Sequence, residues 1–213
     1  MAVPIQSQIF NPVTGVFGTG QMQIFGAGQS GYWFVPPGIG KARVRCFGGG
    51  ASGGGGGGFC IKSIYDLSGV TSVAVSAGGI GGTSSFGSYC SATGGVGVAG
   101  GSGVGGDINS SGGTVTATSH GGGVGNIFGN GGGNTTPCAS GSDQTAGIFG
   151  SYGITSSSSA TSGMTQFSID LIGVGGGSGS NAGVNGGGGG AVGGYPGGGG
   201  ASYGAPGMVI VEW

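Results

Sequence analysis

The feature that most constrains this chain is residues 186–200, in which eleven of fifteen positions are glycine. Glycine loses more backbone entropy on ordering than any other residue, so such a run forms neither an ordinary helix nor an ordinary strand. The run is therefore either disordered or packed so closely that a Cβ would clash. Left-handed helices of the polyproline II type, with about three residues per turn and no internal hydrogen bonds, permit the second case. Neighbouring glycine helices can then bond N–H to C=O between them.

The spacers between the glycine runs favour packing over disorder. They carry Val, Ile, Phe, Tyr and Met rather than the Ser, Pro, Glu and Lys that are typical of disordered linkers. Further glycine runs occur at residues 48–58, 78–82, 94–106, 121–133 and 173–179. We therefore predict an all-β plus polyglycine II fold with essentially no α-helix, in which a small β-module carries a stacked bundle of polyglycine II helices.

Composition excludes several classes of protein. Glycine makes up 65 of 213 residues, but seven prolines and an irregular glycine spacing exclude collagen. Only 4% of residues are charged and the formal net charge is −1, so we expect no nucleic-acid partner. No apolar run approaches the length of a membrane span, and the first residues have no signal-peptide pattern.

The β-module is predicted from alternating apolar residues. Residues 31–47 read as two strands around the Pro36–Gly38 turn, and residues 59–65 and 72–76 as two more. The run at 208–213 is strongly β-prone, so we expect it to pair with the strands of residues 31–76 rather than remain a free edge. A further strand is predicted at residues 166–172. The resulting domains are 1–30 (an attachment arm), 31–77 plus 207–213 (the β-module) and 78–206 (the glycine-rich body).

Arg43 and Arg45 lie on the same face of the second predicted strand, so half of the positive charge occupies one short ribbon. This face is either solvated or a docking surface for an acidic partner. The arm before it has too few apolar residues for a core of its own, and we expect it to pack on a partner. Its candidate fibre-attachment residues are Ile5, Phe10, Phe17, Ile24 and Phe25.

Catalysis and metal binding find little support. The carboxylates are scattered singly along the sequence. His120 is the sole histidine, and the sequence contains no nucleophile-elbow motif with which it could form a catalytic triad. We therefore expect that the protein is not an enzyme. The four cysteines contain no C-x-x-C and complete no zinc site of usual spacing, so no metal and no cofactor are predicted. They read as small buried thiols; Cys46 and Cys60 flank the first glycine run and are candidates for neighbouring strands, with a disulfide left open.

The order of these elements resembles the glycine-rich tail-fibre and tail-tip proteins of bacteriophages. The matching features are a strand ending at residues 45–47, the glycine burst 48–58, strands at 59–65 and 72–77, the motif at 81–87 and the ending 207–213. The architecture is also similar to the distal adhesins of T-even-like phages, in which glycine runs form stacked polyglycine helices and the segments between them bind the receptor. The first thirty residues do not follow the attachment domain of that adhesin family.

The resemblance implies a tail-fibre tip adhesin that recognises a bacterial surface receptor, either a protein loop or a glycan. It also implies a place in the virion, synthesis in the host cytoplasm and docking to another tail protein, with a homotrimer favoured over a monomeric cap. Aromatic side chains among small polar residues suit a binding loop. The candidates are Phe128, Phe149, Tyr152, Met164, Tyr195 and Tyr203. The alternative is a structural or ice-binding polyglycine protein, which predicts featureless loops.

Overall fold

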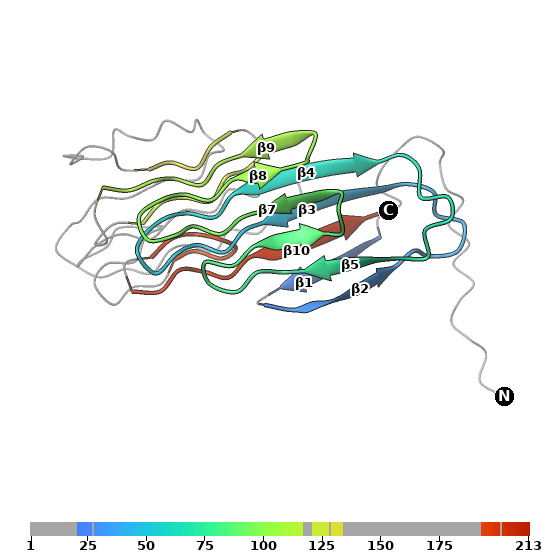
Figure 1. The fold of residues 1–213 in the computed structure, drawn as a ribbon, viewed down its shortest axis with the longest axis horizontal. Coiled ribbons are helices and arrows are strands. Elements are labelled where there is room, and N and C mark those ends of the chain that lie inside the picture. The colour runs from blue at the N-terminus through green and yellow to red at the C-terminus, as the bar shows by residue number, and fades with distance from the viewer. Residues whose placement is uncertain (1–20, 27, 117–120, 128, 134–192, 201) are drawn as a thin grey trace.

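The described part of the chain is all-β. The computed structural model describes residues 21–26, 28–116, 121–127, 129–133, 193–200 and 202–213. Within them the chain forms two five-stranded antiparallel sheets and no helix, which confirms the predicted all-β class (Figure 1). It follows that these residues include no helix that is long and apolar enough to cross a membrane.

The last strand of the chain lies inside the first sheet. Its order is β1 (Met22–Gly26), β10 (Met208–Glu212), β3 (Ala42–Phe47), β4 (Phe59–Ile64) and β9 (Ile108–Ser110). β10 lies between β1 and β3 and pairs antiparallel with both. The prediction that the C-terminal run pairs with the strands of residues 31–76 is therefore confirmed.

The second sheet has the order β2 (Ser30–Phe34), β5 (Ser72–Ser76), β6 (Ser84–Phe86), β7 (Cys90–Ala92) and β8 (Gly103–Val104). The two strands expected on either side of the Pro36–Gly38 turn both form. They do not pair with each other, because β2 pairs with β5 whereas β3 pairs with β10 and β4. The turn thus carries the chain from one sheet to the other.

The short strands β6 to β9 fall within residues 78–206, which the sequence analysis assigned to the glycine-rich body. β1 likewise falls within residues 1–30, the predicted attachment arm, where residues 21–25 alternate as a short strand does. The strands β6 to β9 gave no such signal. Strands of two or three residues rich in serine and glycine give no alternating pattern that a sequence can reveal.

The main core fills the space between the two sheets. Trp33 is fully buried in it, with its ring centroid 5.7 Å from that of Phe86 and 5.6 Å from that of Trp213. The strands of the first sheet contribute inward-facing residues, among them Val44, Cys46, Val209 and Val211. Apolar packing of this kind is what orders the adjoining glycine segments, which have few side chains with which to form a core of their own.

A smaller cluster covers the other face of the first sheet. Phe47, Phe59, Met208, Ile210 and Val124 are buried together there, and the Phe47 and Phe59 ring centroids are 4.9 Å apart. Val124 comes from a glycine-rich segment, not from a strand. Because both faces of β10 are covered, all five of its residues are buried.

Several strands continue directly into glycine-rich segments that extend away from the sheets along the long axis (Figure 1). We call these segments the glycine body: residues 48–58, 78–82, 93–101, 111–115, 121–125, 129–133, 193–200 and 202–207. They are joined through their backbones. The amides of Gly55, Gly56 and Gly57 donate to the carbonyls of Gly97, Gly113 and Gly197, at N···O distances of 2.9, 3.0 and 2.8 Å. Three successive amides thus reach three different segments.

These contacts leave no room for side chains. A Cβ at Gly56 would fall on the carbonyl oxygen of Gly123, and one at Gly113 on the carbonyl oxygen of Gly132, well inside van der Waals contact. Backbone atoms of neighbouring segments cannot move aside as a flexible side chain can. Gly79, in contrast, belongs to a glycine run, but a Cβ added there would have no neighbouring atom within 4 Å.

We expect Gly56→Ala to destabilise the protein by about 1–3 kcal/mol or more, because an extra methyl group must separate two hydrogen-bonded backbones. Gly79→Ala is the matched control. It should be neutral or should stabilise by up to about 1 kcal/mol, since it reduces only the entropy of the unfolded chain. Urea unfolding followed by circular dichroism measures both changes, and equal midpoints for the two variants would show that Gly56 is not closely packed.

Candidate functional site

The predicted receptor and attachment residues are only partly described by the structure. Phe128, Phe149, Tyr152 and Met164 lie outside the described residues, as do Ile5, Phe10 and Phe17. The predicted strand at residues 166–172 also lies outside them. The residues that can be placed are Tyr195, Tyr203, Ile24 and Phe25.

One end of the glycine body, opposite the sheets, gathers residues from distant parts of the chain. The turns at residues 51–54 and 96–99 are linked there, since Ala51 and Gly55 bond to each other and Gly55 also bonds to Gly97. We call this end the tip and define it by those two turns together with Thr114, Gly133, Gly193 and Tyr203. Thr114, Gly133, Gly193 and Tyr203 are joined to the two turns by backbone contacts.

Backbone contacts connect the tip. The amide of Val115 donates to Val98 and that of Gly200 to Ala51, while Gly193 donates to the carbonyl of Tyr203. A Cβ at Gly133 would meet the carbonyl oxygen of Thr114. Gly133 and Gly193 therefore both lie at the tip, and they are the described residues that flank the connection 134–192.

The two placed tyrosines have different environments. Tyr203 is at the tip and 59% exposed, so its ring is available to a partner. Tyr195 is half-buried in the turn at residues 195–197, away from the tip, and packs against the cluster that contains Phe47 and Phe59. Its burial raises the pKa of its hydroxyl group. In this structure Tyr195 is chiefly a packing residue, and of the two tyrosines only Tyr203 is largely exposed.

The two placed attachment candidates also differ. Both belong to β1, the edge strand that pairs with β10. Phe25 is buried in the main core, whereas Ile24 is 42% exposed. Only Ile24 of this pair therefore retains a large surface for a partner, and Phe25 serves the stability of the sheet.

Arg43 and Arg45, on one face of β3, form neither a simply solvated face nor a free docking surface. Arg43 Nε lies 2.6 Å from Glu212 Oε2, and Arg45 Nη2 lies 3.3 Å from Glu212 Oε1. Arg45 and Glu212 are buried, and the register of β3 against β10 places Arg43 opposite Glu212. The sequence left two alternatives for the arginines, solvent or an acidic partner molecule. In the structure both arginines pair instead with Glu212 of the same chain.

We expect Glu212→Gln to lower the free energy of unfolding by about 3 kcal/mol, because it removes the counter-charge of the buried Arg45. Asp107→Asn is the control. Asp107 bonds to Lys62 at 2.7 Å on the surface, where solvent screens the pair, so its loss should hardly move the unfolding midpoint. Comparable losses in the two variants, measured by urea unfolding, would contradict the importance given to burial.

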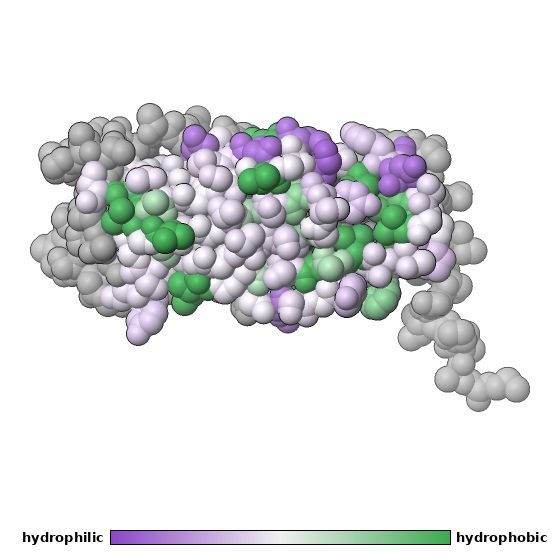
Figure 2. Space-filling view, in the orientation of Figure 1, coloured by the Kyte–Doolittle hydropathy of each residue, from purple (hydrophilic) through white to green (hydrophobic). Residues whose placement is uncertain are grey.

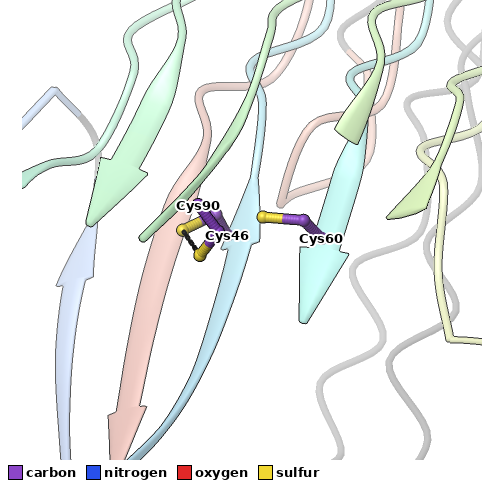
Figure 3. A group of neighbouring side chains, drawn as sticks. All are labelled: Cys46, Cys60 and Cys90. Carbon is purple, nitrogen blue, oxygen red and sulfur yellow. Dashed lines mark hydrogen bonds between the residues drawn. The ribbon is translucent and has the colours of Figure 1, made fainter. Parts of the chain in front are cut away.

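Three cysteine side chains meet between the sheets (Figure 3). Cys46 on β3 and Cys60 on β4 are register partners, which confirms that they lie on neighbouring strands, and both are free thiols. Cys90 comes from β7 in the other sheet, and its Sγ lies 3.8 Å from that of Cys46. No sequence pattern indicates that Cys90 joins this pair, because the contact depends on how the two sheets pack.

The three thiols influence one another's protonation. The pKa of Cys60 is lowered because the Cys46 and Cys90 thiols hydrogen-bond to its sulfur. The pKa of Cys46 is raised by its hydrogen bonds to Cys60 and Cys90 and by burial. The pKa shifts are opposite in direction because the thiols hydrogen-bond to one another, so the three groups titrate as one coupled set. Elsewhere in the described part of the chain, no other group of three His, Cys, Asp or Glu side chains lies close enough together to hold a metal ion.

No family model matches the sequence, and neither a curated protein nor a solved structure is significantly similar to it. The architecture of the chain has two features that bear on its function. They are the opposite positions of the two ends of the molecule and the side chains exposed at each end.

Proposed function

We propose that this protein is the adhesin at the tip of a bacteriophage tail fibre, and that its glycine body is a bundle of polyglycine II helices. In this proposal the bundle is a rigid support between an attachment end and a receptor-binding end. The observation that carries the proposal is the opposite placement of these two ends.

The hydrogen bonds of the glycine body support the polyglycine II geometry. In a β-strand successive residues alternate between two sides, whereas a helix with about three residues per turn points successive groups in three directions. Gly55 and Gly58 both donate to the segment at residues 93–97, while Gly56 and Gly57 donate to two other segments. The same neighbour recurs after three residues, as a threefold helix requires.

The positions of the chain ends and of the connection 134–192 support the proposed arrangement, with attachment at one end of the molecule and receptor binding at the other. Gln21 and Trp213 are hydrogen-bonded to each other at the strand end that faces away from the glycine body (Figure 1). The connection 134–192 starts from Gly133 and returns at Gly193, both at the tip. Connections held on a rigid scaffold are where recognition can vary without harm to the fold. This connection contains Phe149, Tyr152 and Met164, three of the predicted receptor contacts.

The described surface of the glycine body supports a receptor of low charge, and the connection 134–192 adds two acidic residues, Asp143 and Asp170. In the described part of the glycine body, no residue is charged. At the tip Val96 and Tyr203 are exposed, and the face in Figure 2 is mostly intermediate in hydropathy with separate hydrophobic groups. A bacterial outer-surface glycan or protein loop of low charge fits such a surface better than an acidic polysaccharide.

We expect Tyr203→Ala to weaken adsorption of the purified protein to host bacteria by at least about fivefold, the loss expected when an interface aromatic contributing more than about 1 kcal/mol is truncated. Tyr65→Ala is the matched control, since Tyr65 is similarly exposed but follows β4 at the opposite end. Flow cytometry of labelled protein on a panel of bacterial strains measures the effect. Binding to no strain, together with the shaping of growing ice crystals, would instead support the structural alternative.

Attachment is proposed to use residues 1–20 with the exposed side of β1, either in a homotrimer or in a monomeric cap on a fibre. We expect removal of residues 1–20 to leave the unfolding midpoint nearly unchanged but to abolish association, because β1 begins only at Met22. Removal of residues 1–26 is the contrasting variant and should destabilise the fold by exposing β10 and deleting Phe25. Multi-angle light scattering gives the chain count, and a shortened protein that still assembles would contradict the role of the arm.

A further inference from the structure

The thiol cluster of Cys46, Cys60 and Cys90 has an arrangement that simple core packing does not require. Its three sulfur atoms come from β3, β4 and β7, that is, from both sheets, and all lie within 4.8 Å of one another. All three residues are buried, and Figure 3 shows the Cys60 side chain directed toward the other two. From this convergence we propose that the cluster is a binding site for a single monovalent copper ion held by three cysteine sulfurs.

The spacing of the sulfurs fits a three-coordinate ion. Metal–sulfur bonds of about 2.3 Å around a trigonal centre place the sulfurs about 4 Å apart. The Cys46 and Cys90 sulfurs are already 3.8 Å apart, and the cluster as a whole is within 4.8 Å. Only a small inward movement of Cys60 or a change in its side-chain rotamer is therefore needed to close the site.

The donor set selects the kind of ion. Three soft sulfur ligands favour copper(I) or zinc over hard cations, which prefer oxygen. Structural zinc is almost always tetrahedral and takes a fourth ligand, and the described residues supply only three in this group. Monovalent copper is stable with three thiolates. The three cysteines belong to the main core, whose other buried members are apolar, and this environment would also keep water from the ion.

Binding is an exchange of protons for metal and transfers no electron. Each thiol that becomes a ligand forms a copper–sulfur bond and releases its proton to the solvent. The copper enters and remains in the monovalent state. Because the three sulfurs join both sheets, the bound ion also cross-links them, and the loaded protein should be more stable than the free one.

The site is tested on the full-length, reduced protein under anaerobic conditions, with copper(I) acetonitrile complex as the probe. The ion is added both to the native protein and during refolding, since the three sulfurs are buried in the native state. We expect one equivalent to bind in competition with a copper(I) chelator, and the melting temperature to rise by at least about 5 °C. X-ray absorption should find three sulfur neighbours at about 2.3 Å.

Three single variants, Cys46→Ser, Cys60→Ser and Cys90→Ser, should each abolish the stoichiometric binding, while Cys138→Ser should retain it. The absorption measurement uses the unaltered chain, so it decides the matter even if a serine variant fails to fold. Two or four sulfur neighbours, loss of binding in Cys138→Ser, or no retention against the chelator would each overturn the proposal. A preference for zinc over copper(I) would overturn it as well. None of these results bears on adhesion, because the cluster lies between the sheets and away from the tip.

Discussion

The whole structure depends on backbone hydrogen bonds between segments that have almost no side chains. In a chain with 65 glycines, the peptide groups are the main polar groups available for pairing, and burying them unpaired would cost free energy at every position. The glycine body satisfies them by letting each segment bond to several neighbours, as Gly55, Gly56 and Gly57 do. Close approach is the condition for these bonds, and it is the reason that a Cβ at Gly56 or Gly113 would meet a carbonyl oxygen.

Ordering a glycine segment costs much conformational entropy. The glycine body therefore needs a stably folded part of the chain that fixes the positions of its segment ends. The two sheets provide it. β3 leads into the first glycine segment and β4 leads out of it, while β10 receives the chain from the last one. Both faces of β10 are covered, by the main core on one side and by the cluster of Phe47, Phe59 and Val124 on the other. The hydrophobic effect thus acts mainly at one half of the molecule, and backbone bonding extends the order into the other half.

The charged residues and cysteines that the structure describes lie in that same half. All four cations of the chain lie between residues 41 and 62, and two of them share Glu212. The three described cysteines lie between the sheets. The described part of the glycine body has no charged residue, so it contains no ion pair that a change of pH or salt could weaken. This division suits the proposed roles, an attachment half that holds the described charges and a recognition half whose described residues are uncharged.

The sequence by itself determined the all-β class and the strands at residues 59–64, 72–76 and 208–212, because alternation and β-propensity are local properties. The tertiary structure alone decided that β2 and β3 belong to different sheets, that Arg43 and Arg45 share Glu212, and that Cys90 joins the other two thiols. It also decided that Tyr195 packs inside while Tyr203 stays exposed. Each of these is a contact between residues far apart in the chain. Such contacts depend on how sheets and glycine segments stack, and no local pattern records that.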